Sequence, residues 1–144
     1  MNCCLLLVDI IDYSAIGLTM TITTHIDKEA NLRHHKVTGP LTKDELIEKL
    51  KEVYSEPDFD PDMNTLWDLR EADLSSFFSP DIQEVRDFVS EHWGTGGKSR
   101  SALVVSRDLN YGLSRMYEAF LKGKTSSEVA VFRDYDDAVK WIKS

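Results

Sequence analysis

Cysteine is scarce in this sequence of 144 residues, which has two, at positions 3 and 4. Adjacent cysteines do not form an ordinary disulfide framework, and no C-x-x-C spacing is present. Basic residues are missing before Lys28, and Asp9 and Asp12 interrupt the apolar stretch at the N-terminus. A signal peptide needs a basic start and a longer apolar run, and a membrane-spanning helix needs about 20 apolar residues. We therefore expect a cytoplasmic protein without a membrane span.

The first nineteen residues match no element that the rest of the chain needs. A terminal segment that nothing visible ties down is usually poorly ordered. We interpret residues 1–19 as an N-terminal extension, with Met20 as a candidate natural start, and residues 20–144 as one domain. The alternative is that residues 1–19 form an extra strand or a packing arm. Under the first interpretation, deleting them changes the thermal midpoint little.

The charge is acidic and unevenly spread. The formal net charge is −8, and residues 41–92 hold 15 acidic against 5 basic side chains. An acidic stretch repels phosphate backbones, so nucleic-acid binding is not expected as a main function. Hydrophobic content of 42% is ordinary for a globular protein. A chain of this length buries roughly 70% of its extended surface on folding, so the fold requires no disulfide or metal.

Strand and helix signals alternate from residue 20 onward. Segments 21–27 and 31–38, rich in Ile, Thr and Val, flank a Lys-Glu-Ala-Asn break that is typical of a hairpin. The order β-β-α-β-α-β-α-β-α predicts an α/β domain with a mixed, mostly parallel sheet of four or five strands and packed helices. The later predicted strands are 64–70, 101–106 and 129–132, and the predicted helix N-caps are Thr42, Ser79, Asp108 and Asp134.

Two short motifs and the histidines do not amount to a catalytic or metal site. Gly97-Lys98-Ser99 lacks the first glycine of a phosphate-binding loop and lies between a helix and a strand, the wrong context. Ser114 follows a glycine at nucleophile-elbow spacing, but the closing glycine is missing and the position is helical. His34 and His35 are adjacent on a strand, so they point to opposite faces. We expect no catalytic residue, no metal and no cofactor.

Several short strings resemble the SpoIIAA-like bacterial proteins of the STAS superfamily, a group largely without assigned function. The likeness covers about residues 20–143. It implies a sheet of four or five strands with packed helices, and a non-enzymatic module that binds a protein partner or a small ligand in regulation. The strings are Leu66-Trp67-Asp68-Leu69-Arg70, Ala102-Leu103-Val104-Val105, Tyr111-Gly112-Leu113-Ser114-Arg115-Met116-Tyr117-Glu118 and Val131-Phe132-Arg133-Asp134.

The resemblance also implies a possible regulatory site, because the anti-sigma-factor antagonists in this superfamily switch by serine phosphorylation. These proteins carry an Asp-Ser-Ser-Gly string before the second helix, where this sequence has Ser75-Ser76-Phe77-Phe78-Ser79-Pro80. A phosphate on Ser79 would suit a helix N-terminus. Because the string is missing, we interpret Ser79 as a helix cap and not as a phosphorylation site.

One candidate site follows from the strands themselves. Three predicted strands end in Arg followed by an acid: Arg70-Glu71, Arg107-Asp108 and Arg133-Asp134. If the strands are parallel, the arginines gather at the carboxyl edge of the sheet, where open α/β sheets bind ligands. Arginine suits carboxylate or phosphate, so a small anionic ligand is predicted there. The alternative is that a nearby acid neutralises each arginine.

Asp68 is the second candidate position. It lies among apolar residues of a predicted strand, and alternation places it on the face of Leu66 and Arg70, opposite Trp67 and Leu69. A buried carboxylate must be paired or hydrogen-bonded, so we predict a structural or site-forming role.

The sequence leaves three functional hypotheses open. The first is the STAS-like binding or regulatory module, with an unknown protein partner. The second is a carrier of a small ligand or lipid, with a pocket at the sheet edge or at the interface of a homodimer. The third is an enzyme whose acids and bases the sequence does not reveal.

Overall fold

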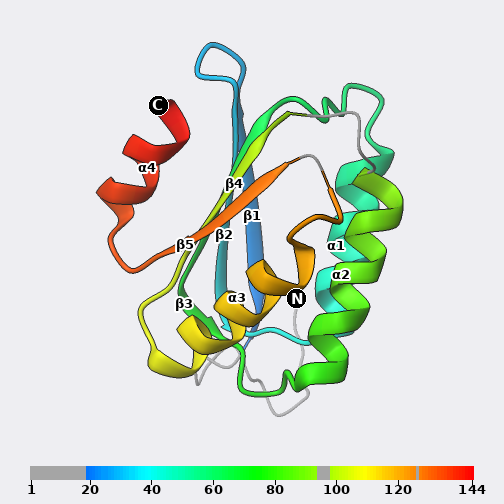
Figure 1. Cartoon of the computed structure of the whole chain (residues 1–144), viewed down its shortest axis with the longest axis vertical. Helices are drawn as coiled ribbons and strands as arrows, with labels where there is room; N and C mark the ends of the chain where they lie inside the picture. The colour runs from blue at the N-terminus through cyan, green and yellow to red at the C-terminus, as the bar shows by residue number, and fades with distance from the viewer. Residues whose placement is uncertain (1–18, 94–97, 126) are drawn as a thin grey trace, which may run out of the picture.

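The computed structural model describes residues 19–93, 98–125 and 127–144 (Figure 1). Its five-stranded sheet has the order β1-β2-β3-β4-β5, so every strand pairs with its neighbours in sequence. The hairpin β1–β2 is antiparallel and the other three pairs are parallel, which confirms the predicted fold class. The elements are β1 (Thr21–Asp27), β2 (Leu32–Pro40), α1 (Lys43–Ser55), β3 (Asn64–Asp73), α2 (Ser79–Trp93), β4 (Arg100–Val104), α3 (Asp108–Leu121), β5 (Glu128–Phe132) and α4 (Tyr135–Lys143).

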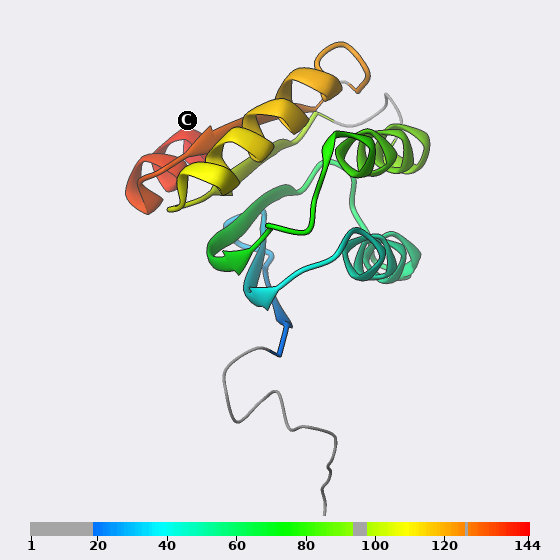
Figure 2. The same cartoon turned by 90° about the horizontal axis from the view of Figure 1, so that it is seen from below.

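The helices lie on the sheet in two unequal layers. Helices α1, α2 and α3 each connect two neighbouring parallel strands. Because such crossovers are right-handed and each new strand is added on the same side, the three helices lie on one face of the sheet. Helix α4 follows the last strand and packs on the opposite face against β3, β4 and β5 (Figure 1). Figure 2 shows α1 and α2 side by side and almost end-on.

Each layer has its own core because side chains alternate along the strands. On β3, Trp67 and Leu69 face α1–α3, whereas Leu66 faces α4. Leu66 packs there with Ala138 and Ile142 of α4. Strand β4 lies between β3 and β5, and it has residues in both cores. The alternation predicted for β3 is therefore confirmed.

Two of the four predicted helix caps are confirmed and two are shifted by one residue. Thr42 and Glu45 form the capping box of α1, and Asp134 accepts a hydrogen bond from the backbone N–H of Asp137. Ser79 is not a cap, because α2 begins at Ser79 and the Phe78 carbonyl accepts the Ile82 N–H at 3.2 Å. The backbone N–H of Phe78 donates to the carboxylate of Asp81, three residues further on, at 2.9 Å. This bond allows the helix to begin one residue earlier than predicted.

Asp108 is the second shifted cap. It is the first residue of α3, and the N-cap is Arg107, which makes no side-chain capping bond. The carboxylate of Asp108 instead accepts a hydrogen bond from Arg133 at 2.9 Å. An acid in the first helical turn still stabilises the helix through the dipole, so the predicted helix was right and the predicted cap wrong.

The start of the described chain touches the end of β2. Gly39 has φ +81°, and a Cβ there would lie 2.5 Å from the carbonyl oxygen of Thr19. Met20 packs against the larger core. Residues 1–18 lie outside the described residues, so the N-terminal extension stays a prediction. In the described parts of the chain, no helix is long and apolar enough to cross a membrane.

Candidate functional site

The parallel strands bring the three predicted arginines to one edge of the sheet but not to one place. Arg70 lies in β3, and its guanidinium stacks over the ring of Tyr135 in α4, 4.8 Å from the ring centroid. Arg133 follows β5 and stacks over Tyr111 in α3, at 4.3 Å. Helices α3 and α4 cover opposite faces, so the two arginines diverge to opposite sides of the edge.

Each of these arginines has an acidic neighbour. Arg107 lies 3.8 Å from a carboxylate oxygen of Asp73, and Arg133 lies 2.9 Å from Asp108. Both pairs are substantially exposed, so they contribute little to stability and leave the arginines accessible. Local pairing was the alternative to an anion site. The ligand-binding role of Arg70, Arg107 and Arg133 therefore stays a prediction.

Asp68 is buried, as predicted, and Arg70 satisfies its charge. The side chain of Asp68 is 5% exposed, whereas that of Arg70 is 43% exposed. The guanidinium donates to both carboxylate oxygens, at 2.9 and 2.8 Å, and the backbone N–H of Arg70 donates at 3.2 Å. These hydrogen bonds hold the pKa of Asp68 below its usual range. The two residues form one bidentate pair on the α4 face.

The same face carries a histidine bonded to the tyrosine beneath Arg70. His34 Nε2 lies 3.1 Å from the hydroxyl of Tyr135. Burial lowers the pKa of His34, opposed by the nearby charge of Asp68. His35 lies on the other face, as alternation predicts, where it bonds to Thr24 and stacks on Trp67. Among the described residues, no three His, Cys, Asp or Glu side chains are placed to hold a metal ion.

Two large apolar side chains are exposed in the part of the chain that the structure describes, and both lie near this edge. Phe78 is 70% exposed and Leu109 is 53% exposed. Phe78 precedes the first residue of α2, and Leu109 is the second residue of α3, so each follows the end of a parallel strand. Ser79, the considered phosphorylation site, is exposed beside Phe78. The sequence analysis singled out neither residue, because Phe78 directly precedes the predicted cap Ser79 and Leu109 directly follows the predicted cap Asp108.

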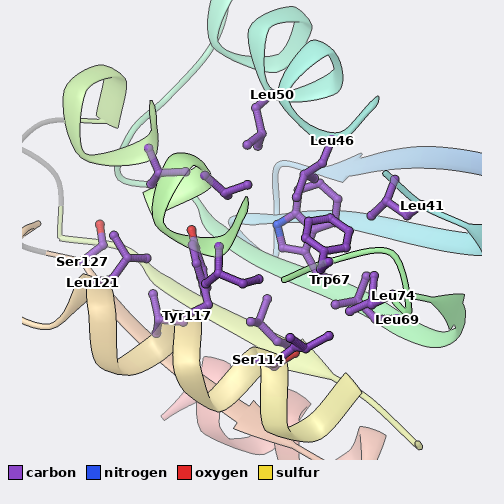
Figure 3. Close-up of a pocket in the computed structure, with 18 of the residues that line it drawn as sticks. Leu41, Leu46, Leu50, Trp67, Leu69, Leu74, Ser114, Tyr117, Leu121 and Ser127 are labelled. Carbon is purple, nitrogen blue, oxygen red and sulfur yellow. The ribbon is translucent and has the colours of Figure 1, made fainter. Parts of the chain in front are cut away.

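A second candidate site is a cavity of about 100 Å³ between the sheet and α1–α3 (Figure 3). Leu41 and Leu74 lie at one end of it, and Leu121 and Ser127 lie at the other. Ordinary ligand pockets measure about 300–1,000 Å³, so this cavity is smaller than the pocket that a lipid carrier needs. An empty cavity costs roughly 24 cal/mol per Å³, or about 2 kcal/mol for this volume.

The cavity is lined by apolar and hydroxyl side chains, with no charged residue among them. The hydroxyls belong to Tyr54, Ser101, Ser114, Tyr117, Thr125 and Ser127. Burial raises the pKa of both tyrosines, which keeps them neutral. The sequence analysis did not predict this cavity.

Comparison with known proteins supports the fold. The chain is similar to the crystal structure of an uncharacterised DUF3478-family protein with a SpoIIAA-like fold from Shewanella loihica PV-4, with a TM-score of 0.53 and 20% sequence identity. The likeness covers 85% of this chain and 93% of that one. No family model matches the sequence, and no curated protein matches it. This chain thus has a SpoIIAA-like fold, as the sequence resemblance implied.

Proposed function

We propose that this protein is a non-catalytic binding module that recognises a protein partner through the carboxyl edge of its parallel strands. The observation that carries the proposal is the exposure of Phe78 and Leu109 at this edge. Exposed large apolar side chains that cluster on one part of a surface are typical of interaction sites.

The surroundings of the two apolar residues fit a protein interface. Arg107 has a side chain that is 55% exposed and lies one residue before α3, close to Leu109. Aromatic residues and arginine are enriched among the residues that dominate binding energy at interfaces. Arg107 and Asp73 form an exposed ion pair that a partner can exchange for its own charges.

The fold adds general support. A regulatory or binding module suits the SpoIIAA-like fold that the chain shares with the Shewanella protein, although that protein is itself uncharacterised. The alternative from the sequence, binding of a small ligand, draws its support from the cavity beneath α1–α3.

The test is affinity capture from a lysate of the source organism with three immobilised proteins. These are the unchanged chain, the double variant Phe78→Ser/Leu109→Ser, and a control, Lys51→Ser/Glu52→Ser, near the far end of α1. We expect a defined partner that the unchanged chain and the control retain, and that the edge variant retains at least tenfold less, because loss of one interface anchor costs about 1–2 kcal/mol. Equal retention by all three proteins would overturn the proposal. Far-UV circular dichroism checks that each variant is folded.

A further inference from the structure

The first strand of the sheet has an outer edge that no other described strand covers. β1 pairs with β2 alone, and β5 forms the opposite edge of the sheet (Figure 2). In an antiparallel strand, the N–H and C=O groups of alternate residues point away from the partner strand. About half of the seven residues of β1 therefore present backbone donors and acceptors that no described strand satisfies.

The outer edge of β1 lacks the features that usually protect an edge strand from pairing with another chain. Such features are a very short strand, Pro or Lys on the edge, or a covering helix or loop. The segment Thr21–Asp27 contains neither Pro nor Lys. By contrast, β5 has five residues and contacts α3 on one face and α4 on the other. Of the two edges, β1 is the one that can accept a further strand.

A groove lies between β1 and α1, beside this edge. Met20 and Ile22 line it from the start of the strand, and both are half-buried. From α1 it is lined by four acidic residues and one basic residue, Lys49. A strand added to β1 would place alternate side chains about 5 Å from those of β1, over Ile22 and toward these acids. Lys and Arg fit this position, because their aliphatic stems cover apolar surface while their charged ends stay in water.

The acidic side of the groove distinguishes between two candidate occupants. Two copies of the chain could join their β1 strands in an antiparallel pair about a two-fold axis. Both α1 helices would then lie on the same face beside the junction, with their acidic sides toward each other. Like charges that meet across an interface are unfavourable. The charge of the groove therefore favours a basic segment of a different protein over a second copy.

We propose that the outer edge of β1 binds an extended segment of a protein partner by strand addition, and that this segment carries Lys or Arg at alternate positions. Main-chain hydrogen bonds to β1 contribute affinity, and the alternate side chains give specificity. The stems of the basic residues cover Met20 and Ile22, and their charged ends reach Glu48. The residues between them lie on the other face, beside Thr23, where β-branched side chains pack well. This surface depends on neither of the exposed apolar residues of the carboxyl edge.

The probe is a synthetic peptide of the length of β1, acetyl-Lys-Thr-Lys-Thr-Lys-Thr-Lys-amide, titrated by NMR with amide hydrogen exchange. We expect it to slow the exchange of the outward backbone amides of β1. It should bind about fivefold or more tightly than a block peptide, Lys-Lys-Lys-Lys-Thr-Thr-Thr, of the same charge. Two N-methylated forms, one methylated at every Lys and one at every Thr, test the backbone bonds. In an added strand only one of these sets of N–H groups points toward β1, so one form binds and the other does not.

A pair of matched variants locates the peptide on the protein. Glu48→Lys reverses a charge in the groove and is expected to weaken binding about fivefold or more. Asp87→Lys on α2 is the control and should leave binding unchanged. The two positions are alike, because Glu48 pairs with Lys51 at 3.3 Å, Asp87 pairs with Arg86 at 2.7 Å, and both acids are exposed.

Four results would overturn the proposal. They are equal binding of the alternating and block peptides, equal behaviour of the two N-methylated forms, equal effects of Glu48→Lys and Asp87→Lys, and slow exchange of the outward amides of β1 in the chain alone. The last result, with a dimeric mass in sedimentation, would make a second copy the occupant of this edge.

Discussion

The pair Asp68–Arg70 is asymmetric in burial, so removing either partner has a different cost. Asp68→Ala removes the carboxylate and leaves Arg70, whose side chain is 43% exposed and can turn to water. A hydrogen bond to a charged group contributes about 1.5–3 kcal/mol to the free energy of unfolding. The loss is smaller here because water can solvate the exposed guanidinium of Arg70 once the carboxylate is gone. We expect Asp68→Ala to lower the free energy of unfolding by about 1–2 kcal/mol.

Arg70→Met leaves the opposite partner behind. The carboxylate of Asp68 is 5% exposed and has no comparable route to water. Breaking a buried pair in this way costs about 3–5 kcal/mol, because a charge stays buried without compensation. One backbone N–H bond to Asp68 remains, so we expect a loss of about 3 kcal/mol, clearly larger than that of Asp68→Ala.

The pH dependence of this loss has a definite sign. In the unchanged protein Arg70 holds the pKa of Asp68 low, so the pair stabilises the fold above about pH 4 and loses this contribution as pH falls through the lowered pKa. In Arg70→Met, burial raises the pKa of Asp68 instead, and the folded state takes up a proton more readily than the unfolded state. The difference between the two proteins should therefore shrink by about 1 kcal/mol or more from pH 7 to pH 4.5.

Urea unfolding followed by circular dichroism measures these differences at both pH values. Glu71→Ala is the control, because Glu71 pairs with Lys36 at 3.3 Å but is 64% exposed, so its loss should stay below about 0.5 kcal/mol. Equal costs of Asp68→Ala and Arg70→Met, or a cost of Arg70→Met that grows as the pH falls, would contradict this account of the pair.

Two further predictions concern the strand ends. Gly39→Ala should destabilise more than Gly123→Ala in thermal unfolding: both glycines have φ +81°, but a Cβ clashes with Thr19 at Gly39 and meets open space at Gly123, and equal losses would contradict the clash. A phosphorylated or carboxylated metabolite that binds the carboxyl edge should raise the thermal midpoint by about 2 °C or more in a thermal-shift screen. This shift should vanish in Arg107→Ala and Arg133→Ala, and a shift that survives both substitutions would rule this edge out.

The order of elements was predictable because local signals agree with the fold. The capping box at Thr42 and the cap at Asp134 are local, and the structure forms both. The start of α2 was misplaced by one residue, because the carboxylate of Asp81, three residues beyond Phe78, accepts the backbone N–H of Phe78 and favours Phe78 over Ser79 as the cap. The choice between two neighbouring caps depends on which backbone N–H the Asp81 side chain reaches, and the sequence does not reveal this.

The arginines show a second limit of sequence reasoning. Parallel strands predict that residues at their carboxyl ends share one edge. Arg107 and Arg133 follow β4 and β5 there, whereas Arg70 lies inside β3, which continues to Asp73 instead of ending at Arg70 as predicted. Which face each side chain takes depends on alternation and on the helix that covers that face. Arg70 turns to Tyr135 in α4 and Arg133 turns to Tyr111 in α3, and no local pattern identifies these aromatic partners.

The cavity was beyond sequence reasoning for a different physical reason. Its apolar lining residues, such as Trp67 and Leu113, belong to the larger core. A cavity depends on the distances between the sheet and the three helices and on how well the side chains between them fill that space. Side-chain volumes that differ by a few methyl groups decide whether a cavity is left.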